Sequence, residues 1–106
     1  MERKSKPDRG ERLRNIRVAL GLSQTDMGQI LGKTRVTVGS MEQGNSEIAV
    51  ADIEVLDSLQ VNAGPYLLYD SPDVFRAPFD QVKTAVRARL DELQAQIKAI
   101  SDKAHN

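Results

Sequence analysis

Residues 13–44, LRNIRVALGLSQTDMGQILGKTRVTVGSMEQG, contain the same local pattern twice. A hydroxyl residue, first Ser23 and then Thr34, precedes a short run of helically spaced apolar residues, and a glycine, first Gly32 and then Gly44, ends the run. Ser and Thr favour the position before a helix because their side-chain oxygen accepts a hydrogen bond from a first-turn N–H. Glycine favours the position after a helix because it adopts a left-handed backbone. The pattern predicts two short helices joined by a tight turn, which is the layout of a helix-turn-helix.

The flanking residues predict three more helices and so an all-α domain. A capping box at Asp8 and Glu11 begins a helix from about residue 9 to residue 20. The run IAVADIEVLDSLQV, residues 48–61, predicts a fourth helix, and a short fifth helix is expected to have Asn62 as its cap. The acidic side chains of the fourth helix that we expect to face water are Asp52, Glu54 and Asp57. Only 4% of the residues are aromatic, which also favours packed helices over a β-sandwich.

The composition excludes several kinds of chemistry. The chain has no Cys and a single His, His105, so disulfides and metal sites built on thiolates or several histidines are not expected. There is no Gly-rich phosphate loop, and the acidic residues at positions 47–57 are not expected to converge, so we expect no enzymatic activity, no metal and no cofactor. No apolar run approaches the ~20 residues that cross a bilayer, so we expect a soluble, cytoplasmic protein without membrane contact.

The charges are unevenly distributed although the net charge is zero. Residues 1–35 contain nine Lys or Arg against four Asp or Glu, whereas residues 36–75 contain seven Asp or Glu and no Lys or Arg. Residues 76–106 contain six Lys or Arg against four Asp or Glu. One face of the molecule can therefore be cationic, and zero net charge is weak evidence against a polyanionic partner.

The chain divides into four segments by composition. We expect a flexible basic arm at residues 1–7 and the helix-turn-helix domain at residues 8–70. A linker bounded by two prolines is expected at residues 71–78, and a long terminal helix at residues 79–106. The cations at the N-terminus are Arg3, Lys4, Lys6 and Arg9. They could follow a nucleic-acid backbone or form a solubilising tail, and the sequence leaves both possibilities open.

The terminal helix carries one apolar stripe, whose members follow one another in steps of three or four residues. The stripe consists of Phe79, Val82, Val86, Leu90, Leu93, Ile97 and Ile100. This is a heptad pattern on a helix of about 24 residues. Such a helix is ~36 Å long, longer than the face of a domain of this size. We therefore expect a coiled coil or bundle between two or more copies of the chain. The alternative is packing within one chain against Leu67, Tyr69 and Phe75.

The residues from about position 11 to position 69 resemble the lambda-repressor-like, Cro-type helix-turn-helix family, also called the XRE family. The matching features are Gly21-Leu22-Ser23-Gln24, Ile30-Leu31-Gly32, Thr34-Arg35 and Met41-Glu42-x-Gly44. The resemblance implies a five-helix domain of a transcriptional regulator that binds double-stranded DNA. The expected protein is a nucleoid-associated repressor that binds a palindromic operator as a homodimer, because half-sites one turn apart require two copies.

The docking geometry of such domains assigns roles to the polar residues. The second helix of the motif places its N-terminal residues against base edges in the major groove, and the preceding helix directs its N-terminus at phosphates. The residues that we expect to read bases are Arg35, Val36, Thr37 and Ser40. Arg35 suits guanine and Val36 the methyl group of thymine, although a phosphate contact and a packing role, respectively, stay open. The residues that we expect along the DNA backbone are Ser23, Gln24, Lys33, Thr34 and Asn45; for Gln24 the resemblance implies a phosphate or adenine contact.

Arg17 and Glu42 occupy positions that often form an ion pair between the first and third helices of this family. The resemblance implies that the pair holds the recognition helix in place. Gly28 and Gly39 each weaken a helix relative to Ala. We expect Gly28 to permit close helix packing, and Gly39 to face outward and permit a close approach to DNA.

A protein-binding adaptor is the competing interpretation. An antitoxin or a coactivator could use the same fold, with the terminal helix clasping another protein. Co-purification with a second chain at a defined ratio would favour the adaptor, whereas a self-dimer that footprints a palindrome would favour the repressor.

Overall fold

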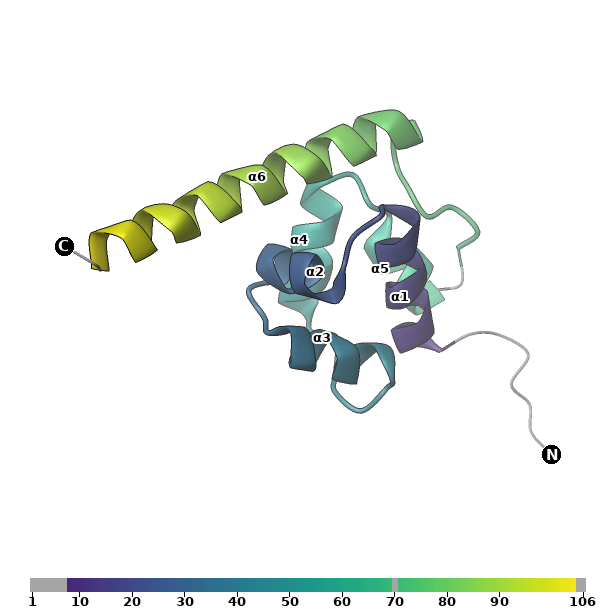
Figure 1. The fold of residues 1–106 in the computed structure, drawn as a ribbon. Helices are drawn as coiled ribbons and strands as arrows, with labels where there is room; N and C mark the ends of the chain where they lie inside the picture. Colours follow the sequence, from purple (N-terminus) through teal and green to yellow (C-terminus); the bar gives the residue numbers. More distant parts are fainter. Residues whose placement is uncertain (1–7, 70, 105–106) are drawn as a thin grey trace.

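The computed structural model describes residues 8–69 and 71–104, and these residues fold into six α-helices (Figure 1). The helices are α1 (Arg9–Ala19), α2 (Gln24–Leu31), α3 (Arg35–Glu42), α4 (Val50–Ser58), α5 (Ala63–Tyr69) and α6 (Phe79–Ala104). The all-α fold predicted from the sequence, with an N-terminal helix-turn-helix and a long C-terminal helix, is confirmed. The predicted basic arm of residues 1–7 and His105 lie outside the described residues.

The two short helices begin and end as their capping residues require. The hydroxyl of Ser23 accepts a hydrogen bond from the N–H of Asp26 at 3.0 Å, and the carboxylate of Asp26 accepts one from the N–H of Ser23 at 3.1 Å. The hydroxyl of Thr34 accepts from the N–H of Thr37 at 3.1 Å. Gly32 has a φ of 71°, a left-handed conformation that ends α2 and turns the chain into α3.

The hydrophobic core has α2 at its centre. This helix packs against α3 on one side and against α6 on the other (Figure 1). The largest fully buried side chains are Leu13, Ile16, Met27, Met41, Leu56, Leu90, Val38, Val61 and Val82. Burial of one such aliphatic side chain contributes ~1.5–3 kcal/mol, so the core ties α6 firmly to the domain. As a result, α3 and α6 lie on opposite sides of the domain.

Two contacts between elements are so close that only glycine fits. A Cβ atom on Gly28 would lie 2.5 Å from the carbonyl oxygen of Lys33, and one on Gly10 would clash with the carbonyl oxygen of Met41. Both contacts are far closer than van der Waals contact. Gly28 therefore lets the turn after α2 pack back on that helix, as expected, and Gly10 lets α1 pack closely on the end of α3.

The segment of residues 71–78 is bound to the domain. Val61 and Phe75 form an isolated antiparallel β-bridge. The side-chain amide of Asn62 donates to the carbonyl oxygen of Asp73 at 2.9 Å. Asn62 therefore holds the segment through its side chain, whereas the sequence predicts a role as the cap of α5.

Two acidic residues of α4 are engaged by the fold, so the expectation that they face water is wrong. Asp52 is 2% exposed, accepts a hydrogen bond from the N–H of Ala49 at 2.9 Å, and lies 3.6 Å from the ammonium group of Lys33. Asp57 accepts from the N–H of Ala63 at 3.1 Å. The reason is local: both carboxylates satisfy backbone donors at helix starts, and such donors have no partner within the helix.

The first half of α6 is part of the core of its own chain. Val82, Val86 and Leu90 are each at most 2% exposed, and α6 makes its contacts chiefly with α2. These three residues are therefore not available to a partner copy, which corrects the expectation that the whole apolar stripe serves dimerisation. Tyr69, a contact expected in the alternative fold-back arrangement, is 79% exposed. The first half of α6 packs on α2 and not on α5 because α2, with its own apolar residues, provides the nearer surface.

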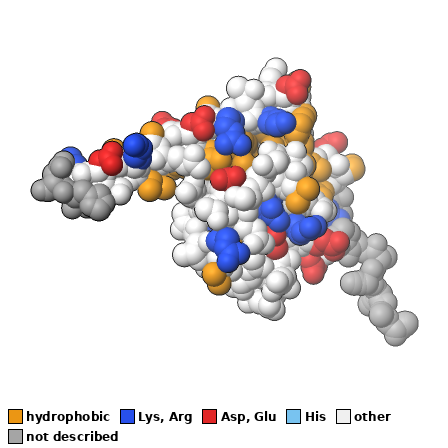
Figure 2. Space-filling model, viewed as in Figure 1, with side chains coloured by type: hydrophobic (Ala, Val, Ile, Leu, Met, Phe, Trp, Pro, Cys, Tyr) orange, Lys and Arg blue, Asp and Glu red, His pale blue; other side chains and the backbone are white. Residues whose placement is uncertain are grey.

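The second half of α6 projects beyond the domain (Figure 1). Figure 2 shows charged and hydrophobic side chains along this projection. Leu93 packs at the edge of the core, but Ile97 and Ile100 are 49% and 69% exposed. The projection makes the molecule elongated, with extents of 60 × 31 × 21 Å. Two members of the apolar stripe in this half of α6 are thus left in solvent, and Phe79, at the start of the stripe, is 39% exposed.

Candidate nucleic-acid interface

The first turn of α3 presents two side chains to solvent. Arg35 is exposed, and its guanidinium makes no ion pair or hydrogen bond with the described residues. Val36, beside it, is 72% exposed. The opposite face of α3 is buried through Val38 and Met41. This turn therefore offers a forked donor and two methyl groups, the two kinds of contact that base edges in the major groove accept.

The other two predicted base-reading residues are partly buried and bonded within the chain. Thr37 uses both its N–H and its hydroxyl in hydrogen bonds with the hydroxyl of Thr34, at 3.1 and 3.0 Å. The hydroxyl of Ser40 lies 2.7 Å from that of Ser46 in the following loop. Contacts with DNA through either hydroxyl compete with these internal bonds, so Arg35 and Val36 are the freer pair.

Arg17 and Glu42 form a two-pronged ion pair between α1 and α3. The Nε of Arg17 donates to Glu42 at 2.7 Å, and its Nη2 donates to the other carboxylate oxygen at 3.1 Å. The side chains are 13% and 4% exposed, so the pair is largely shielded from water. Arg17 also donates through Nη1 to the carbonyl oxygen of Leu22 at 2.9 Å. One guanidinium thus joins α1, the end of α3 and the turn before α2.

Gln24 completes this junction and accounts for Gly39. The side-chain amide of Gln24 donates to Glu42 at 3.2 Å. A Cβ atom on Gly39 would lie 3.6 Å from the same amide, which is an ordinary van der Waals distance. Gly39 therefore faces α2 and Gln24, which corrects the expectation that it faces outward. An alanine would also fit there.

The comparison with protein families gives a match over this same region. Residues 10–60 match the family model described as a helix-turn-helix domain. The N-terminal domain is a helix-turn-helix domain. A domain of this kind indicates a DNA-binding regulator. No curated protein and no solved structure matches the chain.

The helix-turn-helix domain places the predicted backbone-contacting residues around α2 and α3. Ser23 and Thr34 are N-caps, so their hydroxyls are occupied by backbone N–H groups. Lys33 lies in the turn and pairs with the buried carboxylate of Asp52. Asn45 has an exposed side chain and donates its backbone N–H to the carbonyl oxygen of Ser40 at 2.9 Å. Unlike those hydroxyls and Lys33, the side chain of Asn45 makes no hydrogen bond or ion pair with the described residues.

The sequence reasoning missed two contacts that support the helix-turn-helix domain. One is the pairing of Lys33 with Asp52, described above. The other joins α1 to α5: Arg12 is 8% exposed, donates to the carbonyl oxygen of Tyr66 at 2.9 Å, and stacks over its ring at 4.9 Å. Neither has a local sequence signal, because the partners are distant in the chain and each residue type is common on helix surfaces.

The described residues show neither a metal site nor a membrane-spanning helix. No group of three or more His, Cys, Asp or Glu side chains in this part of the chain could hold a metal ion. None of its helices is both long enough and apolar enough to cross a bilayer.

Proposed function

We propose that the protein is a sequence-specific regulator of transcription that binds a palindromic DNA operator as a homodimer, with α3 in the major groove. The observation that carries this proposal is the first turn of α3, where Arg35 is exposed without a partner among the described residues and Val36 is 72% exposed. An exposed Val beside a free guanidinium contributes nothing to the core, but both side chains suit base edges. We propose repression as the outcome, since a dimer on promoter DNA occupies the surface that the polymerase needs.

The junction of Arg17, Gln24 and Glu42 supports a rigid presentation of α3. Base contacts select a sequence only if the reading side chains are held in one orientation, and a shielded two-pronged ion pair resists rotation of the helix. Gln24 is engaged by Glu42, so in this proposal it acts on DNA by positioning α3 or by exchanging that bond for a phosphate.

Selection of bound sequences from random duplex DNA tests the proposal directly. We expect a two-fold symmetric consensus sequence. Arg35→Ala should weaken binding to the selected site by ~1–3 kcal/mol and relax the preference at one position of each half-site, with little effect on non-specific DNA. The matched control is Arg89→Ala, which removes an exposed arginine from α6 on the opposite side of the domain. An unselective pool, or equal losses in both variants, would contradict the proposal.

A second candidate function is an adaptor that binds another protein through α6, as an antitoxin or coactivator does. The exposure of Ile97 and Ile100 favours it, because these side chains lack a cover within the described chain. The mass of the protein in solution separates the candidates: a homodimer supports the regulator, and a complex of defined ratio with a second chain supports the adaptor.

A further inference from the structure

A second stripe runs along α6 and is entirely polar. It consists of Asp80, Thr84, Arg87, Asp91, Gln94 and Lys98, and all six side chains are exposed. The steps between them are 4, 3, 4, 3 and 4 residues, so this polar stripe has the same heptad spacing as the apolar stripe. At 100° per residue it lies roughly 120° around the helix from the apolar stripe. It therefore faces sideways, along the flank of the domain.

The order of charges along the polar stripe is self-complementary when the helix is reversed. Two copies of α6 can pair antiparallel in a register where the numbers of facing residues add to 178. Asp80 then faces Lys98, Thr84 faces Gln94, and Arg87 faces Asp91. Each of these pairs occurs twice by symmetry. We propose that the partner of this face is a second copy of the chain, held in this antiparallel register around a two-fold axis near residue 89.

Other pairings of the same stripe place like charges together. In a parallel, in-register pair every charged residue meets its own copy, so Asp80 and Asp91 face carboxylates and Arg87 faces a guanidinium. Moving the antiparallel register by one heptad brings either Asp80 opposite Asp91 or Arg87 opposite Lys98. Exposed ion pairs contribute little affinity, but charge repulsion excludes wrong partners and wrong registers.

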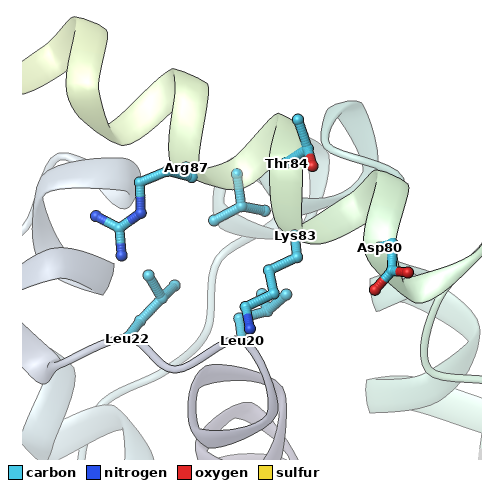
Figure 3. Close-up of a pocket in the computed structure, with 7 residues that line it drawn as sticks. Leu20, Leu22, Asp80, Lys83, Thr84 and Arg87 are labelled. Atoms are coloured by element: carbon cyan, nitrogen blue, oxygen red, sulfur yellow. The ribbon is translucent and has the colours of Figure 1, made fainter.

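A groove beside α6 borders the polar stripe, since Asp80, Thr84 and Arg87 also line it. It has a volume of about 410 Å³ and runs between α6 and the turn that joins α1 to α2, with Leu20, Leu22 and Val86 in its lining. Figure 3 shows Lys83 and Arg87 reaching from α6 toward the two leucines. In the proposed register, Ile97 of the second copy comes level with residue 81, near the end of the groove at Lys83. The projecting half of each α6 thus runs along the rim of the other copy's groove.

This arrangement also directs both recognition helices to the same side. Because the polar stripe faces sideways, the second copy lies beside α6 and not beneath it. The two domains then lie on the same side of the helix pair. In each domain α3 lies on the side away from α6 (Figure 1). The inference shares with the proposed function only the requirement for a dimer. The tests below use no DNA, so the dimer contact and the DNA-binding function can be contradicted separately.

Cysteine cross-linking tests the register, since the chain has no native Cys. Thr84→Cys and Gln94→Cys chains should form a disulfide-linked dimer under mild oxidation when co-expressed, whereas each alone should not. Within one helix these positions are ~15 Å apart, too far for a disulfide. Gln96→Cys, exposed on another face of α6, is the control partner for Thr84→Cys and should give no link. A dimer linked by Thr84→Cys alone, or no link in the mixture, would overturn the proposal.

A charge-exchange experiment tests the central pairs. Arg87→Asp makes both central positions acidic and Asp91→Arg makes both basic, so each variant alone should self-associate at least about tenfold more weakly than the parent. Mixing the two variants should restore dimers, because each acidic pair then meets a basic pair. The weak contact between Arg87 and Asp91 within one helix, at 4.0 Å, is broken in both variants and cannot explain recovery on mixing. Failure to recover on mixing contradicts the inference.

Discussion

At the scale of single residues, Glu42 holds the proposed recognition helix in place without being part of its exposed face. Its two carboxylate oxygens hold Arg17 of α1 and Gln24 of α2, while Glu42 itself lies at the end of α3. Three helices therefore meet at one shielded charge. The orientation of Arg35 and Val36, about two turns earlier on the same helix, depends on this anchor.

Glu42→Ala should lower the free energy of unfolding by ~3–5 kcal/mol, because it leaves a shielded guanidinium without its partner. The control is Glu47→Ala, which removes an exposed carboxylate from the loop after α3. Chemical denaturation of both variants measures the difference, and DNA affinity measured on the fraction that stays folded should fall for Glu42→Ala only. If Glu42→Ala unfolds at the same denaturant concentration as the parent, the anchor role is wrong.

Gly39→Ala and Gly28→Ala should change stability in opposite directions. The new methyl group at position 39 meets Gln24 at an ordinary distance, so the helix should gain ~1 kcal/mol from the better propensity of Ala. At position 28 the methyl group would lie 2.5 Å from the carbonyl oxygen of Lys33, and that clash should outweigh the same gain. Thermal unfolding of the two variants compares them directly. Similar melting temperatures in both would show that the crowding at Gly28 is relieved by a small backbone shift.

At the scale of elements, α6 serves two purposes along its length. Its first half closes the core over α2 with Val82, Val86 and Leu90, and its second half leaves the domain. The change occurs near Leu93, which packs only at the edge of the core. The stability of the domain and the proposed assembly through α6 should therefore be separable at this residue.

Truncation after Leu93 should leave a folded monomer, whereas truncation after Ser71 should destabilise the domain severely. The longer variant keeps the three buried residues of α6, and the shorter one exposes the α2 face that they cover. Loss of three such side chains amounts to ~4.5–9 kcal/mol, comparable to the whole stability of a small domain. Circular dichroism and sedimentation of both variants check this. A well-folded chain ending at Ser71 would show that α6 is dispensable to the core.

At the scale of the whole molecule, α3 lies opposite α6, so the proposed DNA-binding surface is separate from the proposed dimer contact. A dimer built through the sides of α6 keeps both recognition helices free and facing the same way. Half-sites in the major groove must then lie on one face of the duplex, at a spacing of about one helical turn or a multiple of it.

Insertion of about five base pairs between the half-sites, half a helical turn, should reduce the affinity for the operator to that of a single half-site. The rotation moves one half-site to the opposite face of the duplex, beyond the reach of the second α3. Insertion of about ten base pairs, one full turn of the duplex, is the matched control, because it keeps both half-sites on the same face of the DNA. Electrophoretic mobility measurements on the three operators give the affinities, and equal binding to all three would argue against a rigid dimer on DNA.

The sequence by itself determined the features that depend on near neighbours along the chain. The caps at Ser23 and Thr34, the stop at Gly32 and the heptad spacing of α6 need only residues within a few positions of one another, and these predictions of helices hold. Family resemblance added Arg17 and Glu42, which no local pattern joins.

Only the tertiary structure decided which surfaces meet. Whether the apolar stripe of α6 faces a partner or its own chain depends on the surface that α2 offers, about sixty residues earlier, and α2 takes its first half. Likewise, Asp52 becomes a buried partner of Lys33 because the start of α4 packs beside the turn after α2. Hydrogen-bonded capping is a short-range effect that a sequence displays directly, whereas burial is set by the three-dimensional position of elements far apart in the chain.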